Sequence, residues 1–155
     1  MTSLYDKLKH VKSEEDVKDA YIKALGLKSY TKGLIDIQTQ EVWFEAKDTG
    51  KHSTYSQFTQ LLHYVQVALD KGEHIPPFLA VIDTEKAAIM KSSDVIPFLA
   101  KKTVKWGKSA SKYTQEALEE ISAHIGIAVG MPITEHPPHR SRRARFAHRA
   151  PTLGV

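Results

Sequence analysis

Residues 34–47 read Leu-Ile-Asp-Ile-Gln-Thr-Gln-Glu-Val-Trp-Phe-Glu-Ala-Lys. Side chains alternate with a period of two on either side of the polar residues 38–40, and the same alternation extends back to Lys28. This pattern is typical of short β-strands joined by turns. We therefore expect residues 28–47 to form strands of a meander.

Three charged residues stand out in this stretch. Glu45 and Lys47 are two positions apart, so a strand points both side chains to one face. Asp36 is the sole acid of the apolar run 34–37, and a hairpin can bring it beside Glu45. A buried carboxylate is unfavourable unless a cation or a donor compensates it, and a divalent metal ion would do so.

Helices are predicted on both sides of the meander. Ser3 and Ser13 each precede an acid by three residues, which is typical of helix starts. The second of these helices carries an apolar face and stops at Gly26; the face comprises Val17, Ala20, Tyr21, Ala24 and Leu25. A further helix carries Tyr55, Phe58, Leu62, Val65 and Leu69 and ends at Lys71 and Gly72. On it, Gln60 and Tyr64 share one face.

The rest of the pattern predicts a buried central strand over 78–83, with residues 87–90 paired beside it. Ser92 or Ser93 is expected to cap a short helix that contains Pro97. A last helix is marked by Tyr113, Ala117, Ile121 and Ile125, before Gly126. Together these elements predict an α/β domain with a mixed central sheet flanked by helices.

Residues 13–90 resemble the PD-(D/E)xK nucleases, whose core runs αβββαβ, the restriction-endonuclease-like fold. Asp36 matches the first acid of that family, with Ile35 in place of the proline, and Glu45 and Lys47 match the second acid and the lysine. Gln60 to Tyr64 resembles the Gln-x-x-x-Tyr helix motif of the RecB-like branch. The resemblance implies catalytic roles for these five residues in metal-dependent phosphodiester hydrolysis.

The resemblance also implies a Mg²⁺ site, at which Mn²⁺ can substitute. Hard oxygen ligands are available from Asp36, Glu45 and the carbonyl of Ala46. The family often carries an acid on its first helix, and Glu14 fits better than Glu15 because it shares the face of Val17. The simpler interpretation is an exposed Glu45–Lys47 pair and a polar helix edge at Gln60 and Tyr64.

Two segments are predicted to contact DNA. Lys51, His52, Ser53 and Thr54 directly follow the catalytic strand. Lys101, Lys102, Lys105, Lys108 and Lys112 flank Trp106 with no acid among them, which is typical of a phosphate-binding surface beside a stacking ring or of a solvated linker. Asp83 is interpreted as a turn residue at a strand end, and the eight His residues show no metal-ligand spacing.

The composition limits the function classes. A chain of 155 residues without cysteine holds one domain and has no thiolate zinc site, cysteine nucleophile or disulfide. We find no apolar stretch near the ~20 residues of a membrane span and no signal peptide, and we expect a bacterial cytoplasmic protein that binds no membrane.

The formal charge is unevenly distributed. The 17 Lys of residues 1–130 are balanced by 17 acids, whereas residues 131–155 hold five Arg, no Lys and one acid and carry the whole net charge of +4. We expect residues 1–130 to form the nuclease domain and 131–155 to be a disordered Arg- and Pro-rich tail, derived from a shifted reading frame or from cloning. The alternative is an Arg-rich arm that binds nucleic acid.

The organisation resembles the N-terminal cleavage domain of type IIG restriction-modification enzymes. Their methyltransferase and specificity region would then lie outside this chain, because residues 75–78 lack the asparagine of an Asn-Pro-Pro-aromatic motif. A dimer would serve double-strand cleavage. The alternatives are a repair or junction-resolving nuclease and an inactive DNA-binding or interaction domain on the same fold.

Overall fold

The computed structural model describes residues 3–129, so the predicted tail at 131–155 lies outside the described residues. Two helices, α1 (Leu4–Leu8) and α2 (Glu14–Leu25), come first. They are followed by β1 (Ile37–Gln38), β2 (Val42–Ala46) and α3 (Thr54–Asp70). The chain continues through β3 (Phe78–Ile82), β4 (Ala87–Lys91), the 3₁₀ turn η1 (Ser92–Asp94), α4 (Ile96–Ala100), α5 (Gln115–Ala123) and the π-helical segment η2 (His124–Val129).

The strands form one mixed sheet in the order β1-β2-β3-β4. The hairpin β1–β2 is antiparallel with Ile37 opposite Phe44, and β3–β4 is antiparallel as well. Between them β2 and β3 run parallel, with Phe44 opposite Ala80. A parallel pair needs a crossover connection, and α3 provides it.

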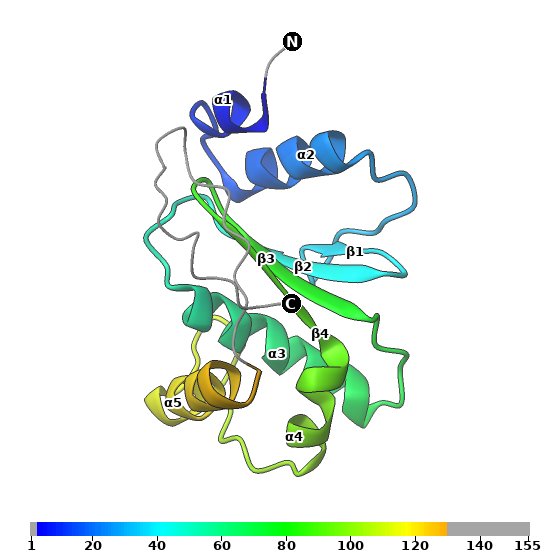
Figure 1. Ribbon diagram of the computed structural model, residues 1–155, viewed down its shortest axis with the longest axis vertical. Helices are drawn as coiled ribbons and strands as arrows, with labels where there is room; N and C mark the ends of the chain where they lie inside the picture. Colours follow the sequence, from blue (N-terminus) through cyan, green and yellow to red (C-terminus); the bar gives the residue numbers. More distant parts are fainter. Residues whose placement is uncertain (1–2, 130–155) are drawn as a thin grey trace.

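Helices cover both faces of the sheet, as Figure 1 shows: α1 and α2 on one face, and α3, α4 and α5 on the other. The sheet has an apolar core on each face, because successive side chains of β2 point to opposite faces. Trp43 packs into the cluster beneath α3, while Phe44 packs into the cluster beneath α2. The prediction of an α/β domain with a mixed sheet flanked by helices is therefore confirmed. No helix in the described part combines the length and apolar character needed to cross a membrane.

The predicted meander is wrong in its first part. Only Ile37 and Gln38 form a strand before β2, and an isolated bridge between Thr31 and Gln38 stands where an additional strand was expected. Leu34, expected within a strand, is 80% exposed. Thr31 and Gln38 exchange both backbone hydrogen bonds across this bridge, and ion pairs of Lys32 with Glu15 and Asp19 connect the same segment to α2. The αβββαβ order is thus incomplete within the described residues.

The helices match the sequence more closely. Ser3 and Ser13 accept hydrogen bonds from the backbone N–H groups of Asp6 and Asp16, and Gly26 ends α2 in the left-handed conformation (φ 65°). The predicted helix between Tyr55 and Leu69 is α3. Three details are wrong: Leu25 is 53% exposed, neither Ser92 nor Ser93 caps α4, and the helical path continues through Gly126 as η2.

The burial pattern predicts how two leucines differ in their contribution to stability. Leu62 of α3 is fully buried and Leu25 of α2 is largely exposed. Replacing a buried leucine by alanine removes apolar contacts and leaves a cavity, so Leu62→Ala should lower the free energy of unfolding by about 2–5 kcal/mol. Leu25→Ala, the matched control, should change it by less than about 0.5 kcal/mol. Urea denaturation measures both, and equal losses would contradict this assignment of the core.

Candidate active site

Two carboxylates meet at the end of the β1–β2 hairpin. Asp36 directly precedes β1, and burial and next the negative charge of Asp36 raise the pKa of Glu45 on β2, so the two carboxylates lie within electrostatic reach of each other. The backbone N–H of Ala46 donates a hydrogen bond of 2.8 Å to Oδ2 of Asp36. The aspartate is thereby fixed beside the glutamate by the backbone of β2 itself.

Lys47 joins this pair from the position directly after β2. Its Nζ lies 3.2 Å from Oε2 of Glu45 and donates a 2.8 Å hydrogen bond to Oε1 of Gln60 on α3. Glu45 and Gln60 are each 5% exposed and Lys47 is 9% exposed. The interpretation of Glu45 and Lys47 as an exposed surface pair therefore does not describe this protein.

Tyr64 stands one helical turn after Gln60 and is half-buried. Its pKa is raised by burial and by the negative charges of Glu45 and Asp36, which shows that the phenol lies within electrostatic reach of both acids. The structure thus joins Glu45, Lys47 and Gln60 by direct contacts and places Asp36 and Tyr64 within electrostatic reach of Glu45.

Glu45 carries the largest electrostatic perturbation of this cluster. Burial, and next the charge of Asp36, raise the pKa of Glu45 to about 7, against the opposing effect of Lys47. Glu14 on α2 contributes a smaller effect of the same sign and is partly buried. An ionised Glu45 is therefore unfavourable at this buried position, and an added cation would stabilise its negative charge.

Sequence reasoning missed Lys18 of α2. Its Nζ lies 3.2 Å from Oδ1 of Asp36 and 3.5 Å from Oε1 of Glu15. Burial alone would lower the pKa of Lys18, but the charges of Asp36 and Glu15 outweigh it and raise the pKa. The spacing in the sequence could have indicated Lys18, because it follows Glu14 by four residues and therefore lies on the same face of the helix.

Asp83 is fully buried but serves the turn after β3. One of its oxygens accepts hydrogen bonds from the backbone N–H groups of Glu85 and Lys86, and the other accepts from Gln57 and from Nζ of Lys86. Nζ of Lys86 also donates to the carbonyl oxygens of Gly50 and His52. This network holds the loop that follows Lys47 against the β3–β4 hairpin.

That loop contains the first predicted DNA-binding segment, and the four residues of the segment differ in how far their side chains are exposed to solvent. Lys51 and His52 are exposed, so both can reach a ligand. The hydroxyl of Ser53 caps α3 by accepting the N–H of Ser56, and Thr54 is only 7% exposed. The structure therefore presents the first two side chains to solvent and uses the other two in the start of the helix.

The second predicted segment is a loop between α4 and α5, here called the lysine loop (residues 101–112). It presents five exposed lysines: Lys101, Lys102, Lys105, Lys108 and Lys112. Trp106 stacks on His63 of α3 with ring centroids 4.9 Å apart, and His63 is next to Tyr64 in the chain. The Thr114 hydroxyl donates to the carbonyl of Lys105 at 2.7 Å. The loop is thus fastened to the helix that carries Gln60 and Tyr64.

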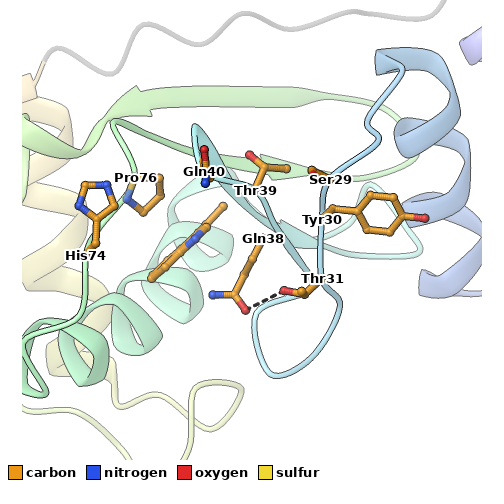
Figure 2. A pocket seen from close by; sticks show the side chains of 9 residues that line it. Ser29, Tyr30, Thr31, Gln38, Thr39, Gln40, His74 and Pro76 are labelled. Atoms are coloured by element: carbon orange, nitrogen blue, oxygen red, sulfur yellow. Dashed lines mark hydrogen bonds between the residues drawn. The ribbon is translucent and has the colours of Figure 1, made fainter.

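A separate pocket of about 440 Å³ lies at the other end of the β1–β2 hairpin. Figure 2 shows its side chains, which are polar or aromatic apart from that of Pro76; they come from Ser29, Tyr30, Thr31, Gln38, Thr39, Gln40, Trp43, His74 and Pro76. The figure marks the 3.5 Å contact between the side chains of Thr31 and Gln38. None of the predicted catalytic residues lines this pocket, so it is distinct from the carboxylate cluster.

Comparison of the chain with protein-family models, with curated proteins and with solved structures gives no significant match. The chemistry of the site is therefore argued from its own geometry.

The donor set at the cluster suits a hard divalent cation. Asp36 and Glu45 supply carboxylate oxygens within electrostatic reach of each other, and the Ala46 carbonyl belongs to the same strand end. The raised pKa of Glu45 shows that a second negative charge is unfavourable there without further compensation. Within the described residues no three His, Asp or Glu side chains form a ready metal-binding group, so water and substrate oxygens would complete the coordination.

The pKa of Glu45 predicts a pH-dependent effect on stability. Its folded-state pKa of about 7 exceeds the ordinary value of 4.5, so the folded chain binds more protons than the unfolded chain between these pH values. The contribution of the neutral carboxyl to stability is complete below pH 4.5 and is lost as the pH rises through 7. Glu45→Gln, which cannot ionise, should gain up to about 3 kcal/mol of stability over the parent chain between pH 4.5 and pH 8.

Urea denaturation in the presence of a chelator measures this difference. Glu41→Gln, at an exposed position four residues earlier, is the control and should show no such gain. A stability difference between Glu45→Gln and the parent that is the same at both pH values would contradict the environment described for Glu45.

Proposed function

We propose that this protein is a Mg²⁺-dependent DNA endonuclease domain. The observation that carries the proposal is that the Asp36 carboxylate is bound to the backbone directly after Glu45, while Lys47 is held between Glu45 and Gln60. Acids in this arrangement supply hard oxygen ligands, and a buried lysine beside them supplies a positive charge for a phosphate oxygen. This is the chemistry that phosphodiester hydrolysis requires.

The metal ion, when bound, would polarise a phosphate oxygen and make a bound water more acidic. Asp36 and Glu45 would hold it, with the Ala46 carbonyl as a third ligand from the same strand and Glu14 as an outer acid. The side chain of Lys47 is restrained by two partners, so its ammonium keeps a fixed position at which it orients the attacking water and stabilises charge that develops on phosphate.

Gln60 and Tyr64 would act from α3. The Gln60 side chain already positions Lys47, and the phenol of Tyr64 can donate a hydrogen bond to a phosphate oxygen. In the hydrolysis, the water oxygen forms a bond to phosphorus while one phosphorus–oxygen bond to the sugar breaks. The water proton passes to solvent, and the departing alkoxide takes up a proton from solvent.

The biological setting that we propose is cleavage within a restriction-modification enzyme of the type IIG kind. The exposed side chains of the lysine loop suit this setting, because contacts from such lysines to phosphates would position DNA without reading its sequence. Sequence recognition would then reside in a methyltransferase and specificity region outside this chain, and pairing of two domains would cut both strands. A bacterial cytoplasmic location follows from that setting.

Two other functions remain as alternatives. A repair or junction-resolving nuclease would use the same cluster but would bind branched DNA tightly by itself. An inactive interaction domain is less consistent with the structure, because keeping Asp36, Glu45 and Lys47 in a shielded cluster is costly where no chemistry depends on them.

The nuclease proposal predicts that the chain nicks or cuts plasmid DNA in the presence of Mg²⁺ or Mn²⁺ and not in the presence of a chelator. Asp36→Ala, Glu45→Ala and Lys47→Ala should each lower the cleavage rate by at least about 100-fold, because each removes a metal ligand or a transition-state charge. Agarose gel assays measure the rate, and circular dichroism verifies the fold. Glu41→Ala is the matched control; full activity of Glu45→Ala would refute the assignment.

The lysine loop predicts the salt dependence of DNA binding. Lys101, Lys105 and Lys108 form no ion pair within the described part of the chain. The logarithm of the DNA-binding constant falls linearly with the logarithm of the salt concentration, and each phosphate contact contributes about 0.9 to the steepness of that line. Changing all three lysines to Gln should therefore make the line less steep by about 2 to 3. Lys12, Lys23 and Lys28, exposed residues of the α2 layer, are the control set. Fluorescence anisotropy at several salt concentrations measures the slope, and an equal effect of both sets would contradict a role for this loop.

A further inference from the structure

Lys18 is a charged residue of the site to which no role has been given. It lies on α2, whereas Lys47 and Gln60 approach the carboxylates from the α3 side of the sheet. The side chains of Lys18 and Asp36 are only 13% and 14% exposed, so solvent screens their ion pair weakly. Both oxygens of Asp36 are engaged, Oδ2 by the Ala46 N–H and Oδ1 by Lys18.

This contact places an ammonium at an oxygen that a metal ion would also need. The cluster of Asp36, Glu45, Lys18 and Lys47 is electrically balanced by its own side chains, since two carboxylates face two ammonium groups. A cation that binds Asp36 through Oδ1 competes with Lys18 for that atom, because two positive centres close to one carboxylate oxygen repel each other.

After displacement from Asp36, Lys18 would still have a negatively charged partner. Nζ of Lys18 lies 3.5 Å from Oε1 of Glu15, an acid three residues earlier on the same helix. Glu15 in turn contacts Lys32, and Lys32 contacts Asp19 at 3.0 Å. A chain of alternating charges therefore runs from Asp36 along the surface of α2, and Lys18 can shift toward Glu15 while remaining paired.

We propose that Lys18 is a positioning residue that holds Asp36 in the metal-free protein and competes with the metal ion for it. This inference rests on the proposed function, because it takes the Asp36–Glu45 pair as the metal site. Its consequence is a metal site that is preassembled without metal and that binds the ion less tightly than its two carboxylates alone would allow. Removing Lys18 should then strengthen metal binding, the opposite of the effect expected when a ligand is removed.

The test is Mn²⁺ binding by the whole chain, measured by isothermal titration calorimetry and by the loss of the free Mn²⁺ signal in electron paramagnetic resonance. Lys18→Met, which keeps the length of the side chain and removes its charge, should bind Mn²⁺ about tenfold more tightly than the parent. Lys18→Arg keeps the charge and should bind as the parent does. Lys32→Met, in the same chain of charges but without contact to Asp36, is the control and should also bind as the parent does.

A second readout uses no metal. With a chelator present, Lys18→Met should melt at a lower temperature than Lys32→Met, because Asp36 then has no ion-pair partner to offset its repulsion of Glu45. Added Mn²⁺ should restore more of the melting temperature of Lys18→Met than of the parent. If Lys18→Met fails to fold, Lys18→Gln gives the same comparison with a polar side chain.

The outcomes separate the two proposals. Equal or weaker Mn²⁺ binding by the neutral variants, with binding lost in Asp36→Asn, would overturn the role of Lys18 and leave the metal site intact. No Mn²⁺ binding by either the parent or the variants would overturn both proposals. Tighter binding by Lys18→Met alone, with Lys18→Arg and Lys32→Met unchanged, is the result that we expect.

Discussion

The hydrogen bond from the Ala46 N–H to Asp36 is the interaction on which the site depends. The regular pairing of β1 with β2 covers only two residue pairs, so the backbone ladder by itself does not hold position 36. The side chain of Asp36 makes the next connection and lies beside Glu45 as a result. Two negative charges are thereby brought together at a shielded position, and this arrangement requires positive partners.

Those partners come from two different layers. Lys18 reaches Asp36 from α2, and Lys47 is held on the other side by Gln60 of α3. This charged cluster thus connects the two helix layers, in addition to the apolar clusters on the two faces of the sheet. The polar cluster that we assign to chemistry is therefore also a connection between the layers.

The crossover through α3 explains why Gln60 and Tyr64 meet the strand end. Because β2 and β3 are parallel neighbours, the chain must return across the sheet between them, and α3 makes that return on the face to which Trp43 points. The loop from Lys47 to α3 is fastened by Lys86, which bonds Asp83 and two carbonyl groups. These contacts of Lys86 fix the position at which α3 begins, and with it the position of Gln60 relative to the sheet.

The amino-acid sequence by itself determined the features that lie within single helices and strands. These are the apolar face of α3, the buried run of β3, the caps at Ser3 and Ser13, and the shared face of Glu45 and Lys47. These depend on local spacing, which the sequence states directly. Tertiary structure alone decided that Leu34 is exposed, that α4 starts without a serine cap, and that Lys18 pairs with Asp36. Each of these depends on tertiary packing. Lys18 and Asp36 meet because α2 packs on the face of the sheet to which Ile37 and Phe44 point, and local spacing does not encode that contact.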